Sequence, residues 1–165
     1  MNDLEKQFRR VERAFDKVLD IRNRDPVEYE DGVWCYIHNC WHLKDWMRTD
    51  GNSLHKNVRK RVDTDVNSFW KLVLLGDLTN RSRHLKINDR ETADDIQNRE
   101  LRIVSAQKAG DDSGEIILIV TDGMKLDYPV RDLAKDTMRI WHTLFKLYGL
   151  RHLLEKSKPS KPPPV

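Results

Sequence analysis

The sequence predicts a mainly α-helical bundle with a three-stranded antiparallel β-meander inserted before the last helix. Apolar residues recur at steps of three and four along several segments, as they do on one face of an amphipathic helix. At about residues 101–128 this spacing gives way to alternation and to β-branched runs separated by turn signals. A length of 165 residues is typical of one domain, and we assign residues 1–154 to it.

The composition narrows the class of protein. Charged residues make up 35% of the chain, and the sequence has neither a long apolar segment nor the apolar centre of a signal peptide. We therefore expect a cytoplasmic protein with no membrane partner. The net charge of +3 excludes a polycation, although basic residues cluster locally. Cys35 and Cys40 are too few for a disulfide framework, so we expect reduced thiols.

The first helix is predicted over residues 3–22, because one apolar stripe runs along an otherwise charged segment. Asn2 or Asp3 can cap its N-terminus. Residues 23–32 hold a proline and several acids and are predicted to be a loop. The stripe consists of Leu4, Phe8, Val11, Phe15 and Val18.

The second helix is predicted over residues 33–48, followed by a turn at 49–52. Its apolar residues spread around the whole circumference, so we expect it to be the buried centre of the bundle. A line of polar side chains runs along one face at helical spacing. This line consists of Cys35, His38, His42 and Asp45.

The third helix is predicted to carry residues 69–84 and to be capped by Asp63, Thr64 or Asp65. Before it, residues 54–62 are basic and form a short helix or the approach to one. Within residues 69–84, an apolar line that we expect to face the core is continued by polar side chains. The line consists of Trp70, Val73, Asp77, Asn80 and His84.

The C-terminal part of the chain combines strands with a final helix. Residues 88–100 are polar, with room for one short helical turn, and the predicted strands follow at residues 101–128. The last helix is predicted over residues 129–148, with Gly149 past its end and an inward face of Val130, Leu133, Thr137, Trp141, Leu144 and Tyr148. Residues 155–165 form a Pro/Lys-rich tail that we expect to be disordered.

The polar groups Asp77, Asn80 and His84 are the strongest candidate site in the sequence. Buried polar side chains need partners, so the three either form a hydrogen-bond network that fixes helix packing or line a site for chemistry. Nearby cations favour the second interpretation, because phosphate groups bind where several cations converge. These cations are Arg81, Arg83 and Lys86, and Arg59, Lys60 and Arg61 lie on a segment that could fold against them.

The polar line of the second helix would support that site through His38, His42 and Asp45. Cys35, His38 and His42 also have side chains that ligate zinc. The sequence contains neither HExxH nor CxxC, however, and the alternative is that neighbouring helices satisfy these groups. We therefore predict no metal and no cofactor.

Two segments together carry a resemblance to a known family. Residues 41–46, WHLKDW, and residues 77–84, DLTNRSRH, resemble the paired HLxDW and D-x-x-N-x-x-[KR]-H segments of uncharacterised bacterial and phage helical-bundle proteins. The second segment is similar to a divergent form of the HEPN motif, which is Arg, a polar residue that is often Asn, three further residues and His. Asn80 and His84 match that motif, but Thr79 occupies the arginine position.

The resemblance implies a HEPN-like, homodimeric helical bundle that engages RNA or another phosphate-bearing ligand. HEPN proteins include RNases of toxin–antitoxin and phage-defence systems. In a metal-independent RNase of this kind, His84 would be the acid and base, Asn80 would orient it, Asp77 would hold its tautomer, and Arg83 or Arg81 would clamp the phosphate. Because Thr79 replaces the arginine, the alternative is a non-catalytic homodimeric interaction protein with an antitoxin-like partner.

Overall fold

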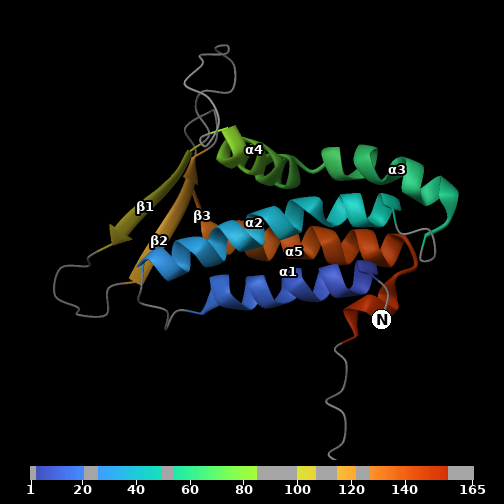
Figure 1. The fold of residues 1–165 in the computed structure, drawn as a ribbon, viewed down its shortest axis with the longest axis horizontal. Coiled ribbons are helices and arrows are strands. Elements are labelled where there is room, and N and C mark those ends of the chain that lie inside the picture. The colour runs from blue at the N-terminus through green and yellow to red at the C-terminus, as the bar shows by residue number, and fades with distance from the viewer. Residues whose placement is uncertain are drawn as a thin grey trace, which may run out of the picture.

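A computed structural model describes residues 3–20, 26–49, 54–84, 100–106, 115–121 and 127–155, with side chains throughout except at residues 26, 81–84, 100–106, 115–121 and 127. The protein is mainly helical, as predicted (Figure 1). The elements are α1 (Asp3–Leu19), α2 (Pro26–Thr49), α3 (Lys56–Asn67), α4 (Trp70–His84), β1 (Glu100–Ala106), β2 (Glu115–Thr121), β3 (Asp127–Pro129), α5 (Val130–Leu147) and the short 3-10 helix η1 (Arg151–Leu154). None of the helices described is both long and apolar enough to cross a membrane.

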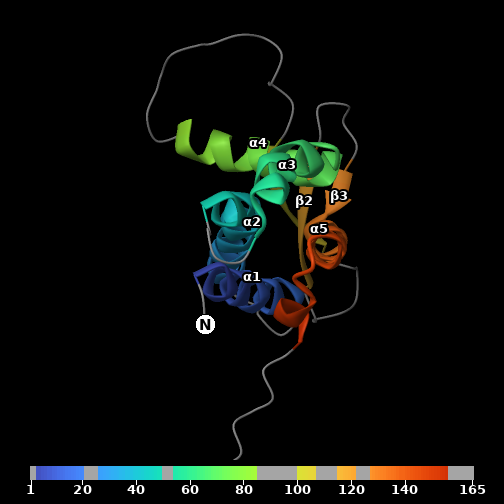
Figure 2. The same ribbon diagram turned by 90° about the vertical axis from the view of Figure 1, so that its right-hand side faces the viewer.

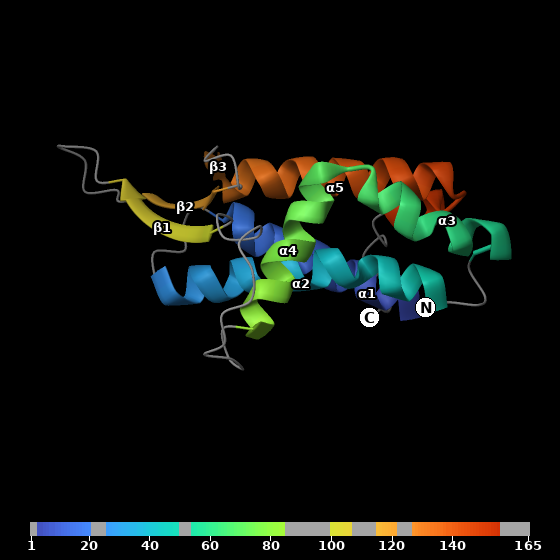
Figure 3. The ribbon, with the colours of Figure 1, turned by 90° about the horizontal axis from the view of Figure 1, so that it is seen from above.

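Three helices form the body of the bundle. α1 runs antiparallel to α2, and α5 packs along the same body in the direction of α2 (Figures 1 and 2). α3 and α4 form a further layer over α2. Seen from above, α4 crosses α2 at a steep angle, while α3 lies at the end of the molecule away from the strands (Figure 3). The crossing of α4 over α2 positions the candidate site.

The prediction for α1 is confirmed in its buried face but not in its length. Leu4, Phe8, Val11 and Val18 are fully buried, and Phe15 packs at the edge of the same core. α1 ends at Leu19, three residues before the predicted end.

α2 starts earlier than predicted, because residues 26–32 are helical rather than a loop. Pro26 stands at the first helical position, where a missing N–H costs nothing. Tyr29 and Val33 are buried and extend the core face of the helix by two turns. α2 contacts α1, α3 and α4, yet it is not buried on all sides as predicted, since Trp46 is 36% exposed.

The boundary between α3 and α4 also differs from the prediction. Asp63, Thr64 and Asp65 lie inside α3 and do not cap α4. His55 is the N-cap of α3, where its Nδ1 accepts a hydrogen bond from the Asn57 amide at 3.3 Å. Because Val62 and Val66 of this helix are both fully buried, one amphipathic helix continues to Asn67 and the chain breaks at residues 68–69.

The strands pair antiparallel in the order β1-β2-β3, and the sheet adjoins the start of α5. Leu101 pairs with Val120, and Val120 pairs in turn with Tyr128. α5 follows β3 directly, with Pro129 as its N-cap, and it ends before Gly149, whose φ of 76° suits glycine. The predicted inward face of α5 is confirmed, with five members buried and Tyr148 half-buried.

A buried polar network joins α2 to α5 in the centre of the core. The Tyr36 hydroxyl donates to the Ala134 carbonyl at 3.0 Å and lies 2.7 Å from Thr137 Oγ1. Thr137 Oγ1 donates to the Leu133 carbonyl at 2.8 Å, and the Cys40 thiol donates to the Tyr36 hydroxyl at 3.5 Å. These groups are satisfied in place, so the network fixes how the two helices pack. Residues 156–165 of the predicted tail and residues 88–99 of the polar segment with the predicted turn lie outside the described residues, whereas Glu100 begins β1.

Candidate functional site

The predicted polar line of α4 lies mostly on its outer side, which corrects the expectation that it faces the core. Trp70 is 51% exposed, Asn80 is exposed, and Val73 and Asp77 are half-buried. The buried face is turned by about 200°, or two residues, from the predicted line. It consists of Leu72, Leu74, Leu75, Gly76, Leu78 and Thr79. Asn80 therefore stands at the surface, and Asp77 lies at the boundary between the surface and the buried face.

The α4 backbone approaches α2 closely at Gly76 and Trp41. A Cβ atom placed on Gly76 would lie only 2.6 Å from Cζ2 of Trp41. Gly76 therefore lets the α4 backbone rest directly on the Trp41 ring. Asp77 and Asn80 follow within about one turn of this crossing, and His38 and His42 lie one turn or less from Trp41 on the other helix.

The polar line of α2 divides into separate local contacts. His42 Nδ1 lies 2.8 Å from Asp45 Oδ2, so this predicted pair is brought together. His38 instead meets the edge of the Trp34 ring, with centroids 5.9 Å apart. Cys35 lies next to the Asn39 amide, whose Nδ2 is 3.4 Å from the thiol sulfur.

The zinc alternative can be examined for the part of the chain that has described side chains. There, no group of three or more His, Cys, Asp or Glu residues is arranged to hold a metal ion. Cys35 is exposed and borders an open pocket of about 620 Å³ between the end of α1 and the start of α2. Lys17, Asp20, Glu28 and Asp31 also border this pocket, which therefore mixes charges of both signs.

The remaining predicted site residues belong to the end of α4 and beyond. Arg81, Arg83 and His84 lie in the last turn of the helix, where the backbone is described but the side chains are not. Lys86 lies outside the described residues. The backbone thus places positions 81, 83 and 84 on the end of α4 that extends beyond its crossing with α2, which we call the overhanging end (Figure 3).

The Thr79 position, which corresponds to the arginine of the HEPN motif, lies in the core. Thr79 is fully buried on the face of α4 that packs into the bundle. An arginine there would have to bury its charge in the core, which is costly without a partner. The position that carries the arginine in the HEPN motif therefore supplies no cation to the surface at Asn80.

The basic segment of α3 does not fold against the end of α4. α3 precedes α4 and lies at the opposite end from His84 (Figure 3). Within the basic segment, Arg61 is engaged in an ion pair, since its Nη2 lies 3.5 Å from Asp65. Arg48 of α2 pairs with Asp63 of the same helix α3 at 3.1 Å. Arg59, Lys60 and Arg61 are thus unsuited to clamp a phosphate beside His84.

Sequence reasoning missed a surface at the start of α4. Trp70 was assigned to the core, but its ring packs on Tyr128 from β3 with a centroid distance of 5.2 Å. Lys71 forms an ion pair with Asp136 of α5, and the same carboxylate pairs with Arg139 at 3.1 Å. The leucines at positions 72 and 75 were the available signal, because they give an equally good apolar line two residues away.

Comparisons with known proteins give no match, because no protein-family model, curated protein or solved structure is significantly similar to the chain.

Proposed function

We propose that this chain is a HEPN-like helical protein that engages RNA, or another phosphate-bearing ligand, at the overhanging end of α4. The observation that supports the proposal best is the crossing at Gly76 and Trp41. It lifts the polar end of α4 clear of the bundle, where Asn80 is exposed and the sequence continues with two arginines and a histidine. A surface with several cations and hydrogen-bonding groups suits a phosphate backbone.

Residues of α2 near the crossing would serve this site. The contact of His42 Nδ1 with Asp45 orients the imidazole ring and fixes which nitrogen carries its proton when neutral. Lys44 Nζ lies 3.6 Å from the centroid of the Trp41 ring and 3.9 Å from Asp63 Oδ1 of α3, so its charge is already shared with a carboxylate. His42 is therefore the residue of α2 that would serve the site from beside the crossing.

Binding is favoured over cleavage in this proposal. The buried Thr79 leaves the motif without its arginine, so a cleaving site would depend on Arg81 or Arg83 to neutralise the scissile phosphate. His84 would then carry the proton transfers and Asn80 would orient it. The HEPN-like fold and the homodimer belong to the same proposal.

A non-catalytic interaction protein is the second candidate. The observation that favours it is the presence of large apolar side chains on the surface, of which Leu147 at the end of α5 is 66% exposed. Such side chains suit a protein partner or a second copy of the chain. Sedimentation of the purified protein over a range of concentrations would detect a dimer.

The test of RNA engagement compares the wild type with His84→Ala and Asn80→Ala. Labelled single-stranded and hairpin RNAs are incubated with each protein, first in chelator and then with divalent metal, and both cleavage and retardation are scored. His152→Ala is the matched control, because His152 is an exposed histidine on η1, far along the chain from α4. Loss of retardation or cleavage in the two α4 variants alone would support the proposal. RNA that stays intact and unshifted with the wild type would reject it.

A further inference from the structure

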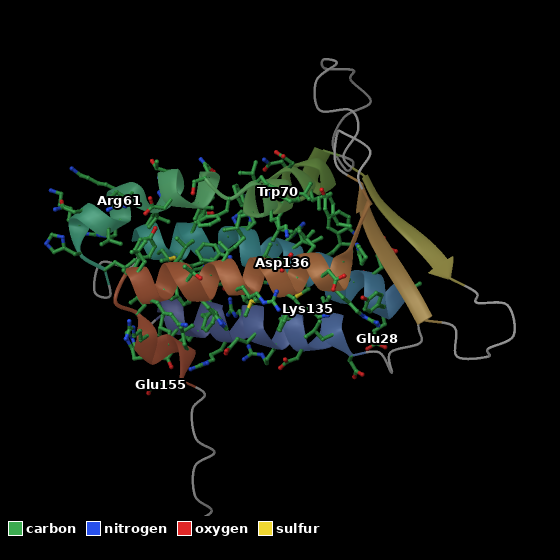
Figure 4. The ribbon with its side chains drawn as sticks, turned by 180° about the vertical axis from the view of Figure 1, so that it is seen from behind. Glu28, Arg61, Trp70, Lys135, Asp136 and Glu155 are labelled. Atoms are coloured by element: carbon green, nitrogen blue, oxygen red, sulfur yellow. The ribbon has the colours of Figure 1, made fainter. Side chains whose placement is uncertain are left out.

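The start of α4 presents an aromatic side chain to solvent. Trp70 is 51% exposed and is the most exposed of the five tryptophans in the chain. Its position on the first residue of the helix places the ring beside the junction of β3 and α5, and Figure 4 shows it above the helix that carries Asp136. An indole of this size leaves a large flat surface available for contact.

A second ring holds Trp70 in place. The Tyr128 ring lies 5.2 Å from it, centroid to centroid, at an interplanar angle of 52°. Tyr128 is only half-buried, so the two rings form one continuous aromatic surface that we call the aromatic platform. Because the rings come from α4 and β3, the platform joins two elements that are distant in sequence.

A cluster with excess positive charge lies beside this platform. Lys71 Nζ lies 5.4 Å from the centroid of the Trp70 ring. Lys71 and Arg139 share the single carboxylate of Asp136, which leaves one positive charge in excess at this cluster. The Arg139 side chain is 77% exposed, so its guanidinium group can bind an anion while it remains near Asp136.

The geometry points to the aromatic platform as a stacking site for the bases of single-stranded nucleic acid, with Lys71 and Arg139 placed to contact the adjoining phosphates. Every base has a flat π face that stacks on an aromatic side chain, and the backbone that links the bases needs nearby cations. A second copy of this chain fits the platform less well, because it would bring Lys71 and Arg139 close to their own duplicates across an interface.

The platform lies on the same side of α4 as the proposed RNA site. Residues seven apart on a helix differ by about 20° in direction, so Trp70, Asp77 and His84 follow one line along α4. Trp70 and His84 are separated by about 21 Å along the helix axis. One strand could therefore contact both ends of α4, and in this respect the inference rests on the proposed function.

The experiment measures the affinity of the full-length protein for a short fluorescent oligoadenylate at low salt, by anisotropy. Trp70→Ala should weaken binding by about fivefold or more, and Trp70→Phe, which retains an aromatic ring, should restore most of it. Trp46→Ala is the matched control, since Trp46 is also partly exposed but lies on α2. A DNA version of the oligonucleotide should behave alike, because stacking does not read the 2′-hydroxyl.

Two further arms separate stacking from charge. An oligonucleotide of equal length that lacks bases should bind the wild type weakly. Its affinity should not fall further in Trp70→Ala. Asp136→Asn should tighten binding and steepen its salt dependence, because it releases Lys71 and Arg139 from their shared carboxylate. Equal binding of the abasic and normal strands, or unchanged affinity in Trp70→Ala, would overturn the inference.

The outcomes distinguish this inference from the proposed function. If Trp70→Ala binds like the wild type while His84→Ala does not, the platform is rejected and the site at the end of α4 stands. If the pattern is reversed, the platform stands and the proposed site is rejected. A Trp70→Ala protein that dissociates from a dimer to a monomer, with no change in oligonucleotide binding, would assign the platform to self-association instead.

Discussion

Gly76 of α4 lies directly on the indole ring of Trp41 of α2, because a Cβ atom at Gly76 would come within 2.6 Å of Cζ2 and 2.7 Å of two neighbouring ring carbons. The Trp41 ring is rigid and held in the body of the bundle, so it cannot move aside as the end of a flexible chain could. The contact fixes where α4 crosses α2, and with it the position of Asp77 and Asn80.

Gly76→Ala should destabilise the protein by about 1–3 kcal/mol, since the added methyl group overpacks the crossing. Urea unfolding monitored by circular dichroism would measure the change. Gly32→Ala is the control, because its Cβ would meet Lys17 Cβ at an ordinary 3.9 Å. In that helix interior, alanine should stabilise the protein by about 0.5–1 kcal/mol. Equal effects of the two substitutions would contradict the tight crossing.

Tyr36→Phe should lower the free energy of unfolding by roughly 1–2 kcal/mol, because it removes a buried hydroxyl that bonds to the Ala134 carbonyl and contacts Thr137 Oγ1. The ring itself remains, so the core volume hardly changes. Thr143→Ala removes an exposed hydroxyl on the same helix α5 and should change the stability by less than about 0.5 kcal/mol. A neutral Tyr36→Phe would show that the network does not join α2 to α5.

The two cysteines should differ in reactivity toward a thiol reagent. Burial raises the pKa of the Cys40 thiol to about 11, partly offset by hydrogen bonding, so almost none of it is thiolate at neutral pH. Cys35 is exposed. The native protein should therefore react rapidly at one thiol and at the second only on unfolding. Cys35→Ser should abolish the rapid phase, and its persistence in that variant would place Cys40 within reach of solvent.

His142 should make the stability depend on pH. Burial against α1 holds its pKa below the usual value, an effect that Lys146 reinforces and Glu12 opposes. Well above pH 6.5, the usual pKa of histidine, the ring is neutral in both the folded and the unfolded states. As the pH falls below that value, the unfolded chain takes up a proton first, so the free energy of unfolding decreases until the folded pKa is passed.

His142→Gln should remove this component of the pH dependence, as measured by urea unfolding between about pH 8 and pH 5. His152→Gln, on the exposed η1, should retain it. A wild type whose stability rises on acidification would contradict the assignment, because that is the sign expected for a histidine with a raised pKa.

The spacing of apolar residues was sufficient to predict the buried side of a helix where that helix has one clear apolar face. In α1 the residues Phe8, Val11 and Val18 are buried as predicted, and so are Leu133 and Trp141 in α5. In these helices the polar residues exclude every other choice of face, so the sequence alone determined which side packs inward.

The candidate site was predicted only in part. The sequence identified Asn80, His42 and Asp45 as candidates. The structure places Asn80 near the crossing of α4 and α2, and it places His42 in contact with Asp45. It could not separate Cys35 and His38 from that pair, because the contacts with Asn39 and Trp34 arise from side-chain conformations that spacing does not reveal.

Only the tertiary structure decided the orientation of α4. Residues 70–78 are apolar nearly all round, so the lines through Trp70 and through Leu72 were equally good candidates for the buried face. The Trp41 ring on α2 selects the side that contains Gly76, since no other side chain there is small enough to admit it. That choice buries Thr79 and leaves Trp70 and Asn80 at the surface, because a shift of two residues turns the buried face by about 200°.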